Sequence, residues 1–166
     1  MVHGPEGQLP TPTIAVRRWH VARWQVGLAA PADAPRSWVE DALTGRVAVV
    51  HREPGAGSQA AFERARAASA PPLPLHGPRV AGHAEAAWRA VTDGIPAVTI
   101  EPAALANGLA FHPLEAHTCE LLATTAHADD PLLHAFLEEL ISERVARRLA
   151  AIGGYDLSGT GTELAA

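Results

Sequence analysis

The chain has 166 residues, of which 48% are hydrophobic and 19% charged, a balance typical of a globular domain rather than a disordered segment. The net charge of -5 excludes a general nucleic-acid binder, which needs a basic face. The single cysteine, Cys119, excludes an internal disulfide and a cysteine-based zinc finger. Because residues 1–10 lack a secretory pattern and no apolar run reaches about 18 residues, we expect a cytoplasmic protein without direct membrane contact.

The N-terminal part of the chain is predicted to contain an arm, a long strand and a short helix. Residues 1–13 hold several glycines and prolines and predict a flexible arm. Residues 14–30 are β-prone and aromatic, which predicts a strand. Ser37 has capping-box spacing to the glutamate three residues later, and Gly45 follows the apolar run, so a short helix is expected between them.

The next segment predicts a strand, a tight turn and a helix. Residues 46–51 form an apolar run of strand length, and residues 52–58 are a glycine-rich turn. A helix is expected from Gly57 to about Ser69, and the proline-rich residues 70–78 predict a surface connection.

The rest of the chain predicts further alternation. The expected strands are residues 97–100, 109–112 and 117–124, and the expected helices are residues 83–93, 101–107, one opened by Asp130 and Pro131, and one capped by Ser142. Residues 158–166 are expected to form a flexible tail, and the four tryptophans to lie in the core. Alternating strands and helices with short connections predict an α/β fold whose sheet is largely parallel or mixed and is flanked by helices.

The glycine-rich turn is the strongest candidate site. A helix that starts after such a turn leaves backbone N–H groups pointing outward, and its dipole favours an anion there. The Ser58 hydroxyl and the Gln59 amide would add donors, and Arg52 would add full charge. The alternative is a plain strand-to-helix connection in which glycine is needed only for steric reasons and no ligand binds. The spacing matches neither a phosphate-binding P-loop nor a dinucleotide fingerprint nor a nucleophile elbow.

His83 and a group of metal-capable residues near His112 are further candidates for a site. His112, Glu115, His117 and Cys119 are metal-capable, but Pro113 interrupts them and no zinc spacing supports a metal site. We therefore expect ordinary strand and loop side chains there, and no metal or other cofactor. His83 begins a helix, and it either points toward the same cleft as Ser58 or caps that helix.

Five ordered patches of sequence resemble the periplasmic-binding-protein-like (type II) domain family found in molybdate-responsive regulators and in fusions to molybdopterin-biosynthesis proteins. The turn at residues 49–58, Val-Val-His-Arg-Glu-Pro-Gly-Ala-Gly-Ser, is similar to the family's N-R-E-P-G-S-G-T turn. The other four patches are Trp24–Leu28, His83 with the helix 87–94, Gly108–Leu114 and Gly153–Asp156. Together they cover about residues 14 to 160.

The resemblance implies a type II periplasmic-binding fold with two α/β lobes around a ligand cleft. Because the matching begins near residue 14, an N-terminally truncated form is expected, with one complete lobe and part of the second. The ligand-binding domain would span residues 14–157. The ligand contacts implied by position are Arg52, Glu53, Gly55, Ala56, Gly57, Ser58 and Gln59, with His83 nearby. The implied ligand is a small anion, either an oxyanion such as molybdate or tungstate or a small carboxylate.

The leading hypothesis is therefore a non-enzymatic domain that binds or senses a small anion. A truncated lobe would leave an apolar face uncovered, so a homodimer or a partner chain is expected to complete it. One alternative is a degenerate accessory or protein-interaction domain with a vestigial cleft. Another is a dehydratase-like enzyme on the same fold, with His83, Glu53 and Ser58 as acid–base candidates.

Overall fold

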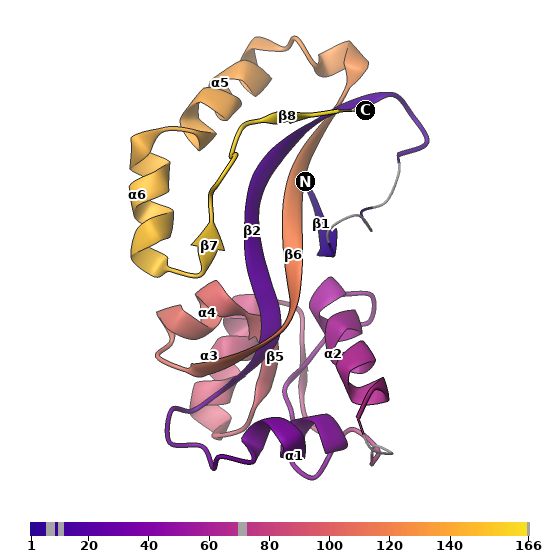
Figure 1. Cartoon of the computed structure of the whole chain (residues 1–166), viewed down its shortest axis with the longest axis vertical. Helices are drawn as coiled ribbons and strands as arrows, with labels where there is room; N and C mark the ends of the chain where they lie inside the picture. Colours follow the sequence, from indigo (N-terminus) through magenta and orange to yellow (C-terminus); the bar gives the residue numbers. More distant parts are fainter. Residues whose placement is uncertain (6–8, 10–11, 70–72, 166) are drawn as a thin grey trace. The chain divides into compact units, whose positions relative to one another are not determined.

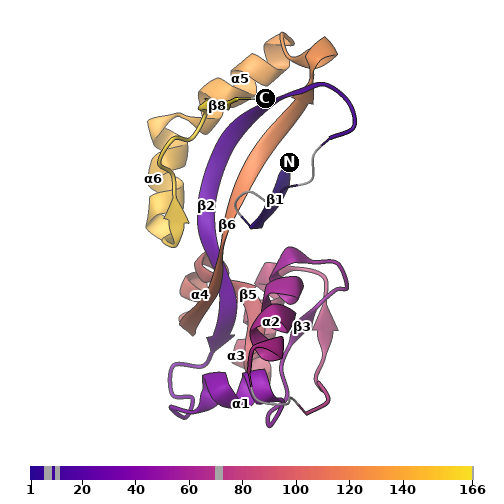
Figure 2. The ribbon, with the colours of Figure 1, turned by 45° about the vertical axis from the view of Figure 1, so that its right-hand side comes forward.

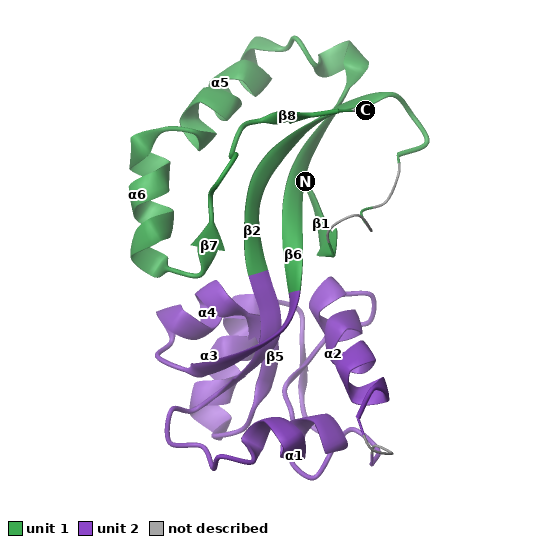
Figure 3. Cartoon of the chain, in the orientation of Figure 1, with its two compact units in different colours: residues 1–24, 116–166 green, residues 25–115 purple. Residues whose placement is uncertain are grey.

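The computed structural model describes residues 1–5, 9, 12–69 and 73–165, and the chain divides into two compact units (Figure 3). Unit 1 is Met1–Trp24 with Ala116–Ala166, and unit 2 is Gln25–Glu115. Two long strands, β2 (Val16–Ala30) and β6 (Ala110–Thr124), run from one unit into the other. The predicted ligand-binding domain thus takes in all of unit 2 and part of unit 1.

Unit 2 alternates short strands with helices, as the sequence predicts. Its elements, besides the shares of β2 and β6, are α1 (Trp38–Thr44), β3 (His51–Arg52), α2 (Gly57–Ala67), β4 (Arg79–Val80), α3 (His83–Asp93), β5 (Ala97–Ile100) and α4 (Glu101–Ala106). β5 pairs antiparallel with the end of β2, and β3 pairs parallel with β4. Val50 adds a parallel bridge to Ala97.

The core of unit 2 has two layers, one on each face of the central strands. Successive side chains of a strand point to opposite faces. Accordingly Ala29 and Ala97 pack in one cluster with α3 and α4, whereas Leu28 and Val98 pack in another with Phe62 of α2 and with α1. Figure 1 shows α2 on one side of β5 and α3 with α4 on the other. Because Phe62 anchors α2 to the central strands, the packing also holds the N-terminus of this helix in place.

Unit 1 combines short strands with two consecutive helices. Beyond its shares of β2 and β6, it contains β1 (Val2–Pro5), the 3-10 turn Thr125–His127, α5 (Pro131–Leu140), α6 (Glu143–Ile152), β7 (Tyr155–Asp156) and β8 (Glu163–Leu164). β1 pairs antiparallel with β6, and β7 and β8 pair antiparallel with β2. Both views show α5 and α6 on one side of β2 with β7 beside α6 (Figures 1 and 2). Parts of the predicted arm and tail are therefore paired strands.

The structure corrects several details of the predicted elements. Pro113 does not interrupt the strand, because β6 is continuous from Ala110 to Thr124. β6 lies between two strands: β1 pairs with its residues 117–120 along one edge, and β2 is its neighbour along the other. The strand predicted at residues 46–51 is shorter, since β3 holds only His51 and Arg52.

Two expected side-chain roles also differ. The Ser37 hydroxyl donates to the Asp41 carboxylate (2.7 Å) and makes no cap hydrogen bond to the N-terminus of α1. Trp88, expected in the core, is 56% exposed. Helix α3 instead turns its small residues Ala86, Ala87 and Ala90 toward the core, since alanines let the helix approach the sheet closely.

The described residues form an α/β fold with mixed sheets flanked by helices. The pairings of β2 with β5, β7 and β8 and of β1 with β6 are antiparallel. The parallel component, β3 with β4 and the Val50–Ala97 bridge, is smaller than the alternation of elements predicts. No helix among the described residues is long and apolar enough to cross a membrane.

Candidate functional site

The chain forms a tight turn before α2, as the glycine-rich sequence predicts. The Ala56 N–H donates to the Glu53 carbonyl (3.2 Å), which closes a four-residue turn with Pro54 and Gly55 at its centre. Gly55 has φ +86°, the left-handed conformation that a type II turn requires at its third position. A Cβ on Gly55 would meet no atom within 4 Å, so its glycine serves backbone conformation rather than close packing.

Helix α2 begins at Gly57 without a capping side chain. Its N-cap residue is Ala56, which offers no side-chain acceptor. Among the described residues, no acceptor meets the backbone N–H groups of Gly57, Ser58 and Gln59, whereas the Ala60 N–H already bonds to the Ala56 carbonyl. Three donors and the positive end of the helix dipole therefore coincide at this end of α2.

Ser58 adds an unusual hydroxyl to this helix end. The residue is only 1% exposed, and its Oγ has no hydrogen-bond partner. Leaving a buried polar group unpaired costs about 1–3 kcal/mol, so proteins normally avoid it. Ser58 therefore places a buried, unpaired hydroxyl in the first turn of a helix whose N-terminus has no side-chain cap.

Arg52 is the centre of a hydrogen-bonded network beside the turn. Its side chain is 6% exposed and donates to both carboxylate oxygens of Glu53 (3.0 and 2.9 Å) and to the Ala81 carbonyl (3.1 Å). The contact between Arg52 Nη1 and His83 Nδ1 is 2.6 Å. Because a guanidinium only donates, Nδ1 accepts, and the ring proton of His83 sits on Nε2. The same guanidinium lowers the pKa of Glu53 and keeps it ionised.

Gln59 links α2 to β3. Its Oε1 accepts from the Arg52 backbone N–H (3.0 Å), and its Nε2 donates to Glu63 (3.1 Å). The Gln59 amide, predicted as a ligand donor, is therefore used inside the protein, and its backbone N–H is what it presents at the helix end. This bond ties the start of α2 to the strand that carries Arg52.

The structure brings the predicted residues of the turn, α2 and α3 into one neighbourhood. His83 is the first residue of α3, but the N-cap is Gly82 and no side chain caps that helix. The alternative in which His83 caps its helix is therefore wrong. Sequence reasoning missed Thr99, whose buried hydroxyl donates to the His83 carbonyl (3.0 Å). Thr99 is the polar residue of the otherwise apolar strand β5, and this is the signal that could have identified it.

His51, the first residue of β3, is buried, and its ring packs against Phe62 of α2. Burial is the main cause that lowers its pKa below the usual value, and the charges of Arg79 and Arg66 act in the same direction. The His76 backbone and Glu63 oppose this shift. His51 therefore stays neutral in the folded protein at pH values where an unfolded histidine takes up a proton.

This difference predicts a pH-dependent stability. Below about pH 6.5 the unfolded chain binds a proton at His51 and the folded chain does not, so stability falls as the pH falls, by at most about 1.4 kcal/mol per pH unit. The variant His51→Asn should show a flatter stability profile between pH 7 and 5 in urea unfolding. If His51→Asn keeps the wild-type slope, the prediction is wrong.

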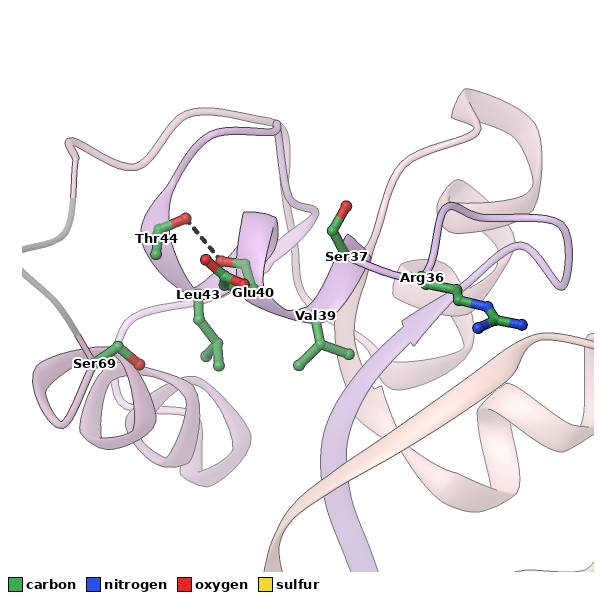
Figure 4. A pocket seen from close by; sticks show the side chains of 7 residues that line it. All are labelled: Arg36, Ser37, Val39, Glu40, Leu43, Thr44 and Ser69. Atoms are coloured by element: carbon green, nitrogen blue, oxygen red, sulfur yellow. Dashed lines mark hydrogen bonds between the residues drawn. The ribbon is translucent and has the colours of Figure 1, made fainter.

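Two cavities of unit 2 involve none of the predicted ligand residues. One, about 510 Å³, is lined by Arg36, Ser37, Val39, Glu40, Leu43, Thr44 and Ser69. Figure 4 shows these side chains, with Thr44 hydrogen-bonded to the Glu40 backbone. The other, about 520 Å³, is lined mostly by apolar and proline residues with Asp33 and Asp41 at its polar positions. Neither combines unpaired helix N–H groups with a buried donor, as the start of α2 does.

The metal-capable residues of β6 lie in different surroundings. Glu115 is paired with Arg64, and His112 is exposed beside Trp38, both in unit 2. His117 and Cys119 are buried in unit 1, where burial raises the pKa of the Cys119 thiol. Within the described parts of the chain, no group of three or more His, Cys, Asp or Glu side chains could hold a metal ion.

Comparison with known families gives a match over most of the chain. The family model of the PBP superfamily domain matches residues 8–140. The chain belongs to the PBP superfamily. No curated protein matches it. The periplasmic-binding-like part of the resemblance is thereby confirmed, whereas membership of the molybdate-regulator family stays a prediction.

Solved structures share the fold of this chain. One is an ABC transporter substrate-binding protein from Clostridium perfringens, assigned to phosphate and solved with bound phosphate. It has 12% sequence identity and a TM-score of 0.63 over 86% of this chain and 72% of that one. The second is an ABC-type phosphate transport receptor from Vibrio cholerae, with 12% identity and a TM-score of 0.54 over 93% of this chain and 78% of that one. The α/β architecture predicted from the sequence is thus confirmed as that of periplasmic-binding structures.

Proposed function

We propose that unit 2 binds a small tetrahedral oxyanion at the N-terminus of α2. The observation that carries this is the coincidence of three N–H groups lacking acceptors with the buried, unpaired Ser58 hydroxyl. An oxyanion accepts several hydrogen bonds at once and is stabilised by the helix dipole. Such a ligand would satisfy all four donors together.

The charges around α2 favour binding through backbone donors. The carboxylate of Glu53 already takes two hydrogen bonds from Arg52, so the positive charge of Arg52 is largely offset. The net charge of -5 gives no long-range attraction for an anion. We therefore expect moderate affinity that depends on the geometry of the helix end and less on ionic strength.

Two observations favour a tetrahedral oxyanion as the ligand. The sequence resemblance favours molybdate or tungstate, and the two solved structures described above carry phosphate in their names. All three anions are tetrahedral and share the same acceptor geometry. Binding is favoured over the dehydratase alternative because Ser58 Oγ has no hydrogen bond, so no Ser58–His83 acid–base pair is formed.

The variant Ser58→Ala tests the proposal with two effects of opposite sign. Without ligand, removing an unpaired buried hydroxyl should leave the free energy of unfolding unchanged or raise it. With ligand, losing one hydrogen bond to a charged group costs about 1.5–3 kcal/mol, so the affinity should fall about 10- to 100-fold. Calorimetric titration with phosphate, sulfate, molybdate and tungstate, together with melting curves, measures both effects.

The matched control is Ser69→Ala. Ser69 lies just beyond the C-terminal end of α2, and its hydroxyl donates to the Ala65 carbonyl. This variant should bind the anion as tightly as the wild type. A saturating anion should stabilise the wild type by about 2.7 kcal/mol at a hundredfold excess over Kd. If no oxyanion raises the melting temperature at millimolar concentration, the proposal is wrong.

A further inference from the structure

The larger of the two pockets of unit 2 lies between α1 and α3 and shares no residue with the anion site proposed above. Its volume is about 520 Å³, and its apolar walls come from Trp38 of α1, Val47, Val91 of α3 and Ile95 just beyond that helix. Pockets that enclose small molecules usually have about 300–1,000 Å³ and mostly apolar walls. We call this the Trp38 pocket.

The charged side chains that line the Trp38 pocket are both acidic. They are Asp33 and Asp41, and no arginine or histidine lines the pocket. Asp41 accepts hydrogen bonds from Ser37 (2.7 Å) and Arg46 (3.3 Å), which lower its pKa and keep it ionised. Arg46 offsets part of this charge. Asp33 is exposed, and no hydrogen bond or ion pair joins it to another described residue, so its carboxylate is available to a ligand.

The C-terminal end of α3 adds negative potential to the same wall, at Val91 and Gly94. Within the described parts of the chain, no backbone N–H from beyond α3 bonds to the carbonyls of its last turn, unlike at the ends of α1 and α4. A helix C-terminus carries about half a negative charge and favours a cation. The N-terminus of α1 reaches the pocket at Trp38, but Glu40 and Asp41 in its first turn offset that positive end.

We propose that the Trp38 pocket binds a small organic cation, a protonated amine carried on an apolar body about the size of a phenyl ring. The apolar body packs against Val91 and Ile95, and the ammonium group lies by Asp33 and the carboxyl end of α3. The indole of Trp38 stabilises the cation further through its ring. An anionic ligand would meet only negative groups here. The proposal does not depend on the anion site at α2.

Three compounds with the same phenyl ring separate the effect of charge from that of apolar burial: phenethylamine, phenethyl alcohol and hydrocinnamate. Each is titrated into the isotope-labelled full chain at about pH 7.5, where the amine is charged and ordinary histidines are neutral. Phenethylamine should shift the indole N–H resonance of Trp38 with a millimolar Kd, because a ligand with so few atoms binds weakly. The alcohol should bind at least about threefold more weakly, and hydrocinnamate more weakly still. An alcohol that binds as tightly as the amine, or no binding of the amine at tens of millimolar, would overturn the proposal.

The variant Asp33→Asn tests the carboxylate. Because Asp33 is exposed, its loss should raise the Kd for phenethylamine by only about three- to fivefold, and it should leave the affinity for phenethyl alcohol unchanged. The matched control is Glu85→Gln, at an exposed acidic position of α3 that does not line the pocket. This control should keep the wild-type Kd for the amine. If Asp33→Asn keeps it too, Asp33 is not the partner of the cation and the proposal is wrong.

The variant Val91→Arg tests the location of the bound amine. Val91 is 50% exposed, so the fold should persist in circular dichroism, whereas a guanidinium at the pocket wall should repel the ammonium and raise its Kd at least about tenfold. The matched control is Thr92→Arg, which adds the same charge at the next position of α3, outside the pocket lining. Binding to Val91→Arg with the wild-type Kd would mean that the amine binds elsewhere and would refute the proposal.

Discussion

Replacing Gly27 with alanine should destabilise the protein by about 3 kcal/mol or more. Gly27 lies in β2 within unit 2, and a Cβ there would stand 2.1 Å from the His112 carbonyl oxygen and 2.9 Å from a ring atom of Phe111. The first of these atoms belongs to the backbone of β6, so the clash cannot be relieved by a side-chain rotation. The two strands would have to move apart, at the expense of their hydrogen bonds and the core beneath them.

The effect should appear as a drop of roughly 10 °C in melting temperature and a lower urea midpoint. The matched control is Gly82→Ala at the N-cap of α3, where a Cβ meets no atom within 4 Å and φ is negative. That variant should cost less than about 1 kcal/mol. Similar unfolding curves for Gly27→Ala and Gly82→Ala would show that β2 and β6 do not approach as closely as described.

Local signals in the sequence predicted the elements of unit 2 well. Gly45 and Gly94 end α1 and α3 in the left-handed conformation, as glycine stop signals predict. The Glu53-Pro54-Gly55 sequence predicts the tight turn that leads into α2. Each of these signals acts within a few residues, so the local sequence is enough to predict the helix ends and the turn.

Features decided by distant residues could not be predicted in the same way. The hydrogen bond between Arg52 and His83 joins positions 31 residues apart and depends on how β3 and α3 pack. The exposure of Trp88 follows from the close approach of α3 to β5, which its alanines permit and its tryptophan would prevent.

In the candidate site, too, the local features were predicted and those that depend on distant residues were not. The sequence indicates the glycine turn and the helix that starts at Gly57, and both are present. It does not indicate that the Gln59 amide and the Arg52 guanidinium are already bonded inside the protein. Side-chain donors near an anion site are interchangeable in a sequence pattern, and only the packing decides which of them remain available.

Arg52→Leu should lower the free energy of unfolding by about 2–3 kcal/mol. Breaking a buried charge pair typically costs about 3–5 kcal/mol, but the Glu53 side chain is 41% exposed, so water can replace part of what it loses. The Ala81 carbonyl and His83 Nδ1 would lose their donor at the same time. Arg52→Lys should recover only part of the loss, because an ammonium cannot bind both Glu53 oxygens in a fork.

The matched control for Arg52 is Arg64→Leu on α2. Arg64 also pairs with a glutamate in unit 2, but its side chain is 53% exposed, and exposed ion pairs contribute at most about 1 kcal/mol. Urea unfolding should therefore separate the two leucine variants clearly. Equal losses would mean that solvent replaces the Arg52 network as easily as a surface pair. A selective loss at Arg52 would show that its buried network with Glu53, Ala81 and His83 stabilises unit 2 more than an exposed ion pair does.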